Sequence, residues 1–163
     1  MLKVVGNKLF FAGKEYNCAI GKNGFSENKK EGDGCSPIGV FALRECWYRA
    51  DKMPPPKTNL PIKIIHENDG WCDDVESEDY NKCVKLPYRF SHEKLWRSDH
   101  VYELIIPLGY NDSPIIKGAG SAIFMHIARE KYEGTEGCIA LSLSDLLEIL
   151  PMLSAKNFIE IGA

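Results

Sequence analysis

The sequence predicts a mostly β fold, an α+β arrangement rich in strands, that forms one domain over residues 1–163. Eight short runs are rich in β-branched and aromatic residues and are bounded by turn residues, whereas segments with helical periodicity are few. A chain of 163 residues is long enough to build one complete hydrophobic core. Because no internal repeat or low-complexity tract interrupts the sequence, we expect a single domain.

The strand candidates are distributed from the first residues to the last. They occupy residues 2–5, 8–13, 16–21, 39–48, 61–66, 101–110, 121–128 and 157–162. The stretch 49–61 is rich in proline, which donates no hydrogen bond to a neighbouring strand. We therefore expect this stretch to be a surface connection.

Two segments have helical patterns. Residues 142–150 (SLSDLLEIL) begin with Ser142 and Asp145 in the S-x-x-D pattern, which is typical of a helix N-terminus. Helical spacing then places four leucines on one face, namely Leu143, Leu146, Leu147 and Leu150. A shorter helix is predicted at residues 91–96 (SHEKLW). The first helix follows Cys138 closely, so we expect its start to lie beside that cysteine.

The composition is that of an ordinary globular protein. Hydrophobic residues make up 44% of the chain and the net charge is −3, so no basic surface predicts a nucleic-acid partner. The opening residues 1–21 have short apolar runs broken by polar residues, without the apolar core of a signal peptide. No run reaches the roughly twenty apolar residues of a membrane span. We expect no membrane span, and the pattern leaves localisation and oligomeric state open.

The cysteines and histidines do not have the spacing of metal ligands. The six cysteines form no C-x-x-C pair, which a zinc site of the finger type requires, and we expect most of them to fill the core or loops. An acidic stretch at 66–79 lacks the spacing of a calcium loop. His66, His92 and His100 share no local ligand spacing. The sequence predicts neither a metal site nor a cofactor.

One stretch of the chain carries residues suited to nucleophilic catalysis. Residues 121–142 (SAIFMHIAREKYEGTEGCIALS) contain His126 at the end of a predicted strand and Cys138 after a glycine. Cysteine attacks as a thiolate, which a nearby base and amides near a helix start stabilise. Gly137 permits a turn that points amide hydrogens at a developing oxyanion. We interpret Cys138 as a candidate nucleophile and His126 as its candidate base.

Other cysteine chemistries fit this segment poorly. A tyrosine phosphatase needs C-x5-R, but Ser144 stands six positions after Cys138. Proteases of the papain type place the cysteine before the histidine in the chain. A sortase requires an arginine downstream of the cysteine, and residues 139–163 contain none.

The chain resembles the L,D-transpeptidase family of YkuD type over most of its length. Four segments occur in the order of that family, namely KEGDGCSPIGVF at 30–41, GYND at 109–112, GSAIFMHIA at 120–128 and TEGCIAL at 135–141. The resemblance implies a YkuD-like mixed sheet or sandwich with a few short helices. It also implies that Cys138 is the nucleophile, that His126 is general base and then general acid, and that the amides around Gly137 and Cys138 bind the oxyanion.

The resemblance further implies a substrate and a cellular role. Members of the family form a thioester on peptidoglycan stem peptides and pass it to an amine, as transpeptidases, or to water, as L,D-carboxypeptidases. Cell wall biogenesis, a role in cell shape, a bacterial source and a location in the periplasm or cell envelope are implied in the same way. A catalytically silent domain that only binds peptidoglycan remains an alternative.

The segment around the cysteine departs from the pattern of the family. Many members have a second histidine at the position of Glu136 and an arginine or asparagine at that of Ala140. Glu136 is therefore a candidate for orienting His126, and Arg129 is a candidate for binding a substrate carboxylate. Tyr110 is a further candidate substrate contact, and Trp71 with its acidic neighbours is one for a substrate ammonium. The alternative for these charges is a solvated loop.

Overall fold

The structure is a computed structural model that describes residues 1–162. These residues form fifteen strands, which are arranged in four sheets, together with one α-helix and one 3-10 helix. The predicted β-rich fold is therefore confirmed. Within the part of the chain described, none of the helices has the length and apolar character needed to cross a membrane.

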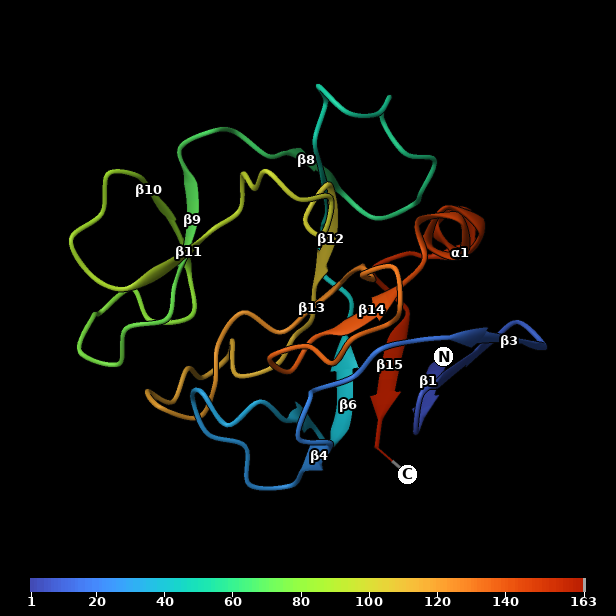
Figure 1. Ribbon diagram of the computed structural model, residues 1–163, viewed down its shortest axis with the longest axis horizontal. Helices are drawn as coiled ribbons and strands as arrows, with labels where there is room; N and C mark the ends of the chain where they lie inside the picture. Colours follow the sequence, from blue (N-terminus) through green and yellow to red (C-terminus); the bar gives the residue numbers. More distant parts are fainter. Residues whose placement is uncertain (163) are drawn as a thin grey trace.

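The first sheet joins the two ends of the chain. Its strand order is β3-β2-β1-β15-β6. β1 pairs with β15 in parallel, so that Leu2 lies opposite Ile159, and the N- and C-termini lie close together (Figure 1). The bounds of its strands are Leu2–Val5 for β1, Lys8–Phe11 for β2, Lys14–Asn17 for β3, Gly39–Ala42 for β6 and Phe158–Ile161 for β15.

The second sheet lies in the middle of the molecule and has the order β14-β13-β12-β7-β8. β12 pairs antiparallel with β13 and with β7, whereas β14 runs parallel to β13 and β8 runs parallel to β7. Its strands span Cys46–Tyr48 (β7), Ile62–Ile64 (β8), Leu104–Pro107 (β12), Phe124–Ile127 (β13) and Ile139–Leu141 (β14). We call it the central sheet.

Two smaller sheets complete the fold. The three-stranded sheet β10-β9-β11 is antiparallel, and we call it the covering sheet because it lies over one face of the central sheet. Its strands are β9 (Asp69–Cys72), β10 (Cys83–Lys85) and β11 (His92–Lys94). The fourth sheet pairs β4 (Phe25–Ser26) with β5 (Ser36–Pro37) in parallel.

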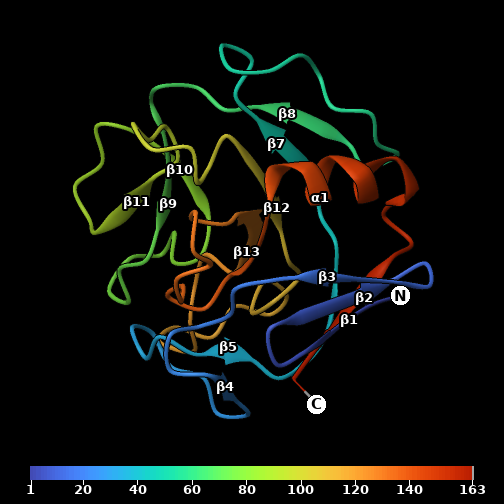
Figure 2. The same ribbon diagram turned by 45° about the vertical axis from the view of Figure 1, so that its right-hand side comes forward.

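Alternation along the strands gives the central sheet two different faces. Side chains of successive strand residues point to opposite faces. Met125 and Ile139 pack into the core shared with the first sheet and with the helix α1 (Leu143–Ile149). Phe124 and Cys138 pack into a second cluster with Trp71 of the covering sheet. The molecule thus has three layers, which Figures 1 and 2 show with the central strands in between.

Most of the predicted strands are present, with shifted boundaries. Each of the eight predicted segments contains strand residues, but segment 39–48 divides into β6 and β7. No strand occurs in 49–61, in agreement with its prediction as a connection. Sequence reasoning missed β4, β5, β9, β10 and β14.

The prediction of a helix at residues 91–96 is wrong. Glu93 lies opposite Trp71 of β9 in an antiparallel pairing, so the segment forms β11. Its hydrogen bonds go to the neighbouring strand, and Leu95 is fully buried behind it. A single helical turn is unstable without tertiary support, whereas a strand here covers the aromatic cluster.

The predicted helix after the cysteine is present, and Ser142 caps it. The Ser142 hydroxyl accepts a hydrogen bond from the Asp145 N–H at 3.1 Å. Leu146 is fully buried, but Leu147 is 44% exposed. The start of the helix does not lie beside Cys138, because β14 intervenes and α1 packs on the opposite face of the central sheet. A helix dipole therefore does not act on the thiol.

Truncation of two adjacent leucines tests this orientation of α1. We expect Leu146→Ala to lower the free energy of unfolding by about 2–5 kcal/mol, because it leaves a cavity in the core. Leu147→Ala, the matched control on the exposed side, is expected to change it by less than about 0.5 kcal/mol. Guanidinium denaturation of both variants measures these values. Equal losses would contradict the orientation of the helix.

Candidate active site

The pairing of β13 with β14 places His126 and Cys138 on one face of the central sheet. His126 lies opposite Ala140 in the parallel register, and Cys138 precedes Ala140 by two residues. Because the side-chain period of a strand is two, Cys138 projects to the same face as Ala140 and His126. Both side chains line one cavity of about 350 Å³ beneath the covering sheet.

The thiol of Cys138 is held by the backbone of the preceding segment. Its Sγ donates to the carbonyl oxygen of Ala122 at 3.2 Å and accepts from the Phe124 N–H at 3.3 Å. Ala122 has a φ of +52°, a conformation that non-glycine residues rarely adopt. The Ala122 N–H donates to Asn81 Oδ1. Asn81 therefore helps to hold the Ala122 carbonyl, which accepts the hydrogen bond from the thiol.

The imidazole of His126 has a defined tautomer. Nδ1 lies 2.9 Å from the carbonyl oxygen of Ile127. A carbonyl oxygen only accepts hydrogen bonds, so Nδ1 carries the proton and Nε2 is the basic nitrogen. The ring packs edge-on against Tyr102, with centroids 5.4 Å apart, and only 6% of the residue is exposed.

Burial keeps both groups neutral in the free protein. It lowers the pKa of His126 to about 4 and raises the pKa of Cys138 to about 12. The charge of Glu93 raises the pKa of the thiol further, whereas the Phe124 N–H and Lys29 oppose the shift. Within residues 1–162 no hydrogen bond joins His126 to Cys138. The thiolate inferred from the sequence is therefore not the state of the free protein.

The turn before the nucleophile depends on glycine, but its amide is engaged. Gly137 has a φ of +140°, and a Cβ at this position would lie 2.7 Å from the carbonyl oxygen of Cys35. The Gly137 N–H donates to Thr135 Oγ1 at 3.1 Å, and the same hydroxyl donates to the Cys138 carbonyl at 2.7 Å. The Ser36 hydroxyl donates to the Gly137 carbonyl. The geometry of the turn is thus fixed, and the Gly137 amide already has a partner.

Two of the other predicted residues line the cavity. Arg129 borders it, is half exposed, and lies 3.6 Å from Asp99. Glu136 also borders it, but its carboxylate forms an exposed ion pair with Lys22 at 2.5 Å. The partner of Glu136 in the structure is therefore Lys22 and not His126.

Tyr110 and Trp71 do not line this cavity. The Tyr110 hydroxyl donates to the Ala119 carbonyl, and its ring packs edge-on against Phe41. Trp71 packs edge-on against Phe124, with centroids 5.0 Å apart. Its Nε1 donates to Asn81 Oδ1, the atom that also holds Ala122. Trp71 thus helps to position the backbone around the thiol, and it lies outside the cavity that contains Cys138.

Several charged residues that line the cavity were missed by sequence reasoning. Glu93 of β11 accepts from the Tyr102 hydroxyl at 2.8 Å, and burial raises its pKa. Glu31 accepts from the hydroxyls of Tyr80 and Ser121. Only weak signals marked these positions, because Glu93 lies in the segment assigned to a helix. Further lining residues that were missed are Lys29 and Arg97, whereas Asp73 belongs to the acidic stretch around Trp71 that the sequence offered as a candidate for a substrate ammonium.

The cavity has no arrangement typical of a metal centre. Among the residues described, no three His, Cys, Asp or Glu side chains are grouped in a way that could hold a metal ion.

Comparison with known proteins assigns the family. Residues 4–161 match YkuD, the L,D-transpeptidase catalytic domain, and the chain belongs to this family. No curated protein matches the sequence. The crystal structure of Mycobacterium tuberculosis L,D-transpeptidase 1 is similar at 11% identity and a TM-score of 0.43, over 100% of this chain. This chain spans 61% of the length of that protein.

The low pKa of His126 predicts a loss of stability in acid. Below pH 6.5 the unfolded chain binds a proton at this histidine, whereas the folded protein binds one only near pH 4. The contribution of His126 to the free energy of unfolding is thus fully present above pH 6.5, and it falls by about 3 kcal/mol as the pH falls to 4. Urea denaturation across this range is expected to show a weaker pH dependence in His126→Gln. The exposed His66→Gln is the matched control, and equal curves for wild type and His126→Gln would contradict the assignment.

Proposed function

We propose that the protein is a cysteine-dependent L,D-transpeptidase that acts on peptidoglycan stem peptides through a thioester. The observation that carries the proposal is the placement of Cys138 and His126 on one sheet face and in one cavity. The tautomer of His126 supports it, because the Ile127 carbonyl occupies Nδ1 and leaves Nε2 to accept a proton.

The first half of the reaction forms the thioester. The Cys138 thiol gives its proton to His126 Nε2 while sulfur bonds to the carbonyl carbon that precedes D-alanine. The π electrons of that carbonyl move to its oxygen. When the intermediate collapses, the C–N bond breaks, and the proton on Nε2 passes to the departing amine of D-alanine.

The second half transfers the acyl group. An acceptor amine attacks the thioester carbon, and the C–S bond breaks. His126 takes a proton from the amine and returns it to the sulfur, which restores the thiol and the neutral imidazole. With water in place of the amine, the same steps describe an L,D-carboxypeptidase.

A neutral thiol and a neutral imidazole are compatible with this sequence of steps. The proton leaves sulfur as the bond to carbon forms, so no free thiolate needs to accumulate in the buried cavity. Exclusion of water strengthens the interactions that stabilise the transition state.

The cavity carries charges of both signs, which suits a stem peptide. A diaminopimelate-type residue presents an ammonium and a carboxylate, so it requires acidic and basic partners. Asp73 Oδ1 is buried without a hydrogen-bond partner within residues 1–162, which makes it available to an ammonium. The acidic lining residues are Glu31, Asp73, Glu93, Glu133 and Glu136, and the basic ones are Lys29, Arg97 and Arg129.

A catalytically silent domain that binds peptidoglycan is the second candidate. The engaged amide of Gly137 and the raised pKa of Cys138 favour it, because both weaken the stabilisation of negative charge in the free protein. Reaction products distinguish the candidates. Crosslinked dimers indicate transpeptidation, trimmed tripeptides indicate hydrolysis, and unchanged muropeptides indicate binding alone.

Replacement of the nucleophile tests the proposal. We expect wild type incubated with purified muropeptides to release D-alanine and to form crosslinked dimers, detected by mass spectrometry. Cys138→Ala is expected to lose this activity and the covalent adduct with a carbapenem, because no other sulfur lines the cavity. Cys83→Ser, at an exposed cysteine, is the matched control and is expected to retain both. An equal adduct on Cys138→Ala would show that another residue is acylated.

A further inference from the structure

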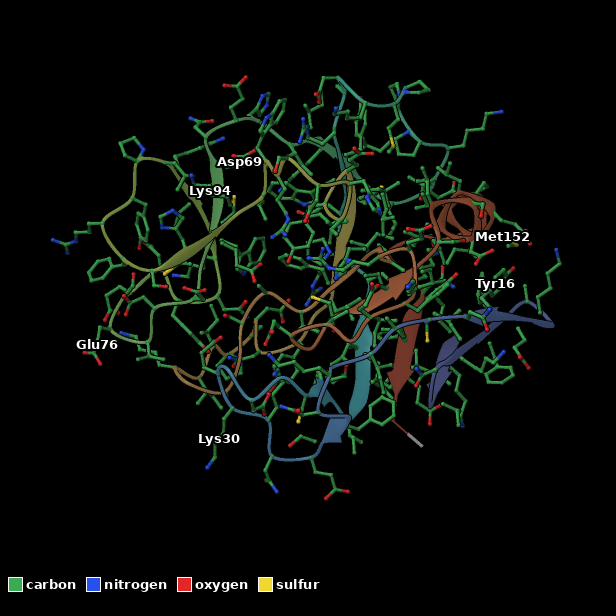
Figure 3. All side chains as sticks on the ribbon, viewed as in Figure 1. Tyr16, Lys30, Asp69, Glu76, Lys94 and Met152 are labelled. Carbon is green, nitrogen blue, oxygen red and sulfur yellow. The ribbon has the colours of Figure 1, made fainter. Side chains whose placement is uncertain are left out.

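Lys29 is a buried cation at the wall of the candidate active site. Its side chain is only 3% exposed, yet it borders the same cavity as Cys138. Burial of an ammonium costs several kcal/mol unless it is paired, and Lys29 is paired with Asp33 at 2.7 Å. The adjacent Lys30 is exposed and points away from the molecule (Figure 3). Two neighbouring lysines thus have opposite environments.

Two glycines leave room for the Lys29 side chain. A Cβ at Gly120 would lie 2.9 Å from Lys29 Cε, and a Cβ at Gly137 would lie 3.3 Å from Lys29 Nζ. Both glycines have positive φ values, of +106° and +140°. The aliphatic part of Lys29 therefore passes Gly120, and its ammonium ends at the turn that immediately precedes Cys138.

The ammonium retains donor capacity towards the cavity. An ammonium has three N–H donors. One is used by Asp33, and the carbonyl oxygen of Lys30 is a weaker partner at 3.5 Å. Asp33 is itself held by the N–H groups of Lys30 and Cys35, at 2.7 and 2.9 Å. Backbone amides thus hold the Asp33 carboxylate in place, and the Lys29 ammonium keeps N–H donors beyond this ion pair.

Negative charge that forms at Cys138 requires a nearby positive charge or hydrogen-bond donor, and the Lys29 ammonium provides both. The Gly137 amide is engaged by Thr135 Oγ1, so it does not stabilise an oxyanion in the present geometry. Glu93 on the covering sheet and Glu136 on the loop before the nucleophile both disfavour negative charge on the sulfur. The other charged or titratable lining groups are Glu31, Asp73, Arg97, Tyr102, His126, Arg129 and Glu133.

We propose that Lys29 supplies the positive charge that stabilises the anionic sulfur of Cys138 and the oxyanion that forms upon its attack. The part that concerns the oxyanion rests on the proposed function. The part that concerns the sulfur does not, because alkylation of a thiol requires no peptidoglycan. Arg97 is less suited to this role, since its guanidinium forms a two-point ion pair with Asp99.

Alkylation rates at fixed pH test the charge of Lys29. Wild type and variants are treated with iodoacetamide at pH 8.5, and modification of each cysteine is followed by peptide mapping. The alkylation rate is proportional to the thiolate fraction, so loss of a nearby positive charge lowers it. Lys29→Met keeps much of the side-chain volume and is expected to slow alkylation of Cys138 about tenfold, a shift of about one pKa unit. Lys30→Met, the matched control, is expected to leave the rate unchanged.

A second variant separates the charge from a structural role. Asp33→Asn keeps the ammonium but removes the carboxylate that opposes it, so alkylation of Cys138 is expected to be unchanged or faster. If the Lys29–Asp33 pair only maintains the fold, both variants loosen it and expose the buried Cys138 thiol, so alkylation becomes faster in both. Faster alkylation of Cys138 in Lys29→Met would therefore overturn the proposal. Slower alkylation in Asp33→Asn, which keeps the ammonium, would overturn it even if Lys29→Met does not fold.

Muropeptide turnover by the same variants keeps the two proposals apart. If wild type leaves muropeptides unchanged, the proposed function fails, while the alkylation rates still decide the role of Lys29. If wild type forms crosslinks but Lys29→Met is alkylated as fast as wild type, the proposal for Lys29 is overturned and the proposed function stands.

Discussion

The parallel pairing of β13 with β14 is the constraint on which the site depends. Met125, Ile127, Ile139 and Leu141 from these two strands are buried in the core shared with the first sheet. A register shift of one residue would turn these apolar side chains to the other face of the sheet. Hydrophobic packing on one face therefore determines that His126 and Cys138 share the opposite face. The two side chains are thus positioned by a part of the core that lies outside the lining of the cavity.

Burial determines the electrostatic state of the two groups. His126 and Cys138 are each only 6% exposed, which disfavours their charged forms and keeps the thiol and the imidazole neutral. Residues of β9 and of the β9–β10 loop hold the local geometry, because Asn81 Oδ1 accepts from both Trp71 Nε1 and the Ala122 N–H. A substrate that enters this cavity meets fixed dipoles and charges instead of mobile water.

Local patterns in the sequence predicted some features well. Alternating apolar residues identified the main strands, the Ser142 cap marked the start of α1, and a glycine beside Cys138 indicated a special turn. Features that depend on long-range packing could not be predicted from the sequence. Glu93 resembles a residue of a solvated helix until β11 pairs with β9. Lys29 cannot be distinguished from Lys30 by residue type, because only the path between two glycines makes it a buried cation.

The central claim is that His126 and Cys138 form a buried, neutral pair on one face of the central sheet. The protonation state of His126 tests this claim most directly. Long-range proton–nitrogen NMR spectra of protein labelled with ¹⁵N-histidine distinguish the two tautomers and the charged ring, and His126→Gln assigns the signal. At pH 7 we expect a neutral imidazole with its proton on Nδ1 and a bare Nε2, as the bond to the Ile127 carbonyl requires. An imidazolium, or a proton on Nε2 alone, would contradict this arrangement.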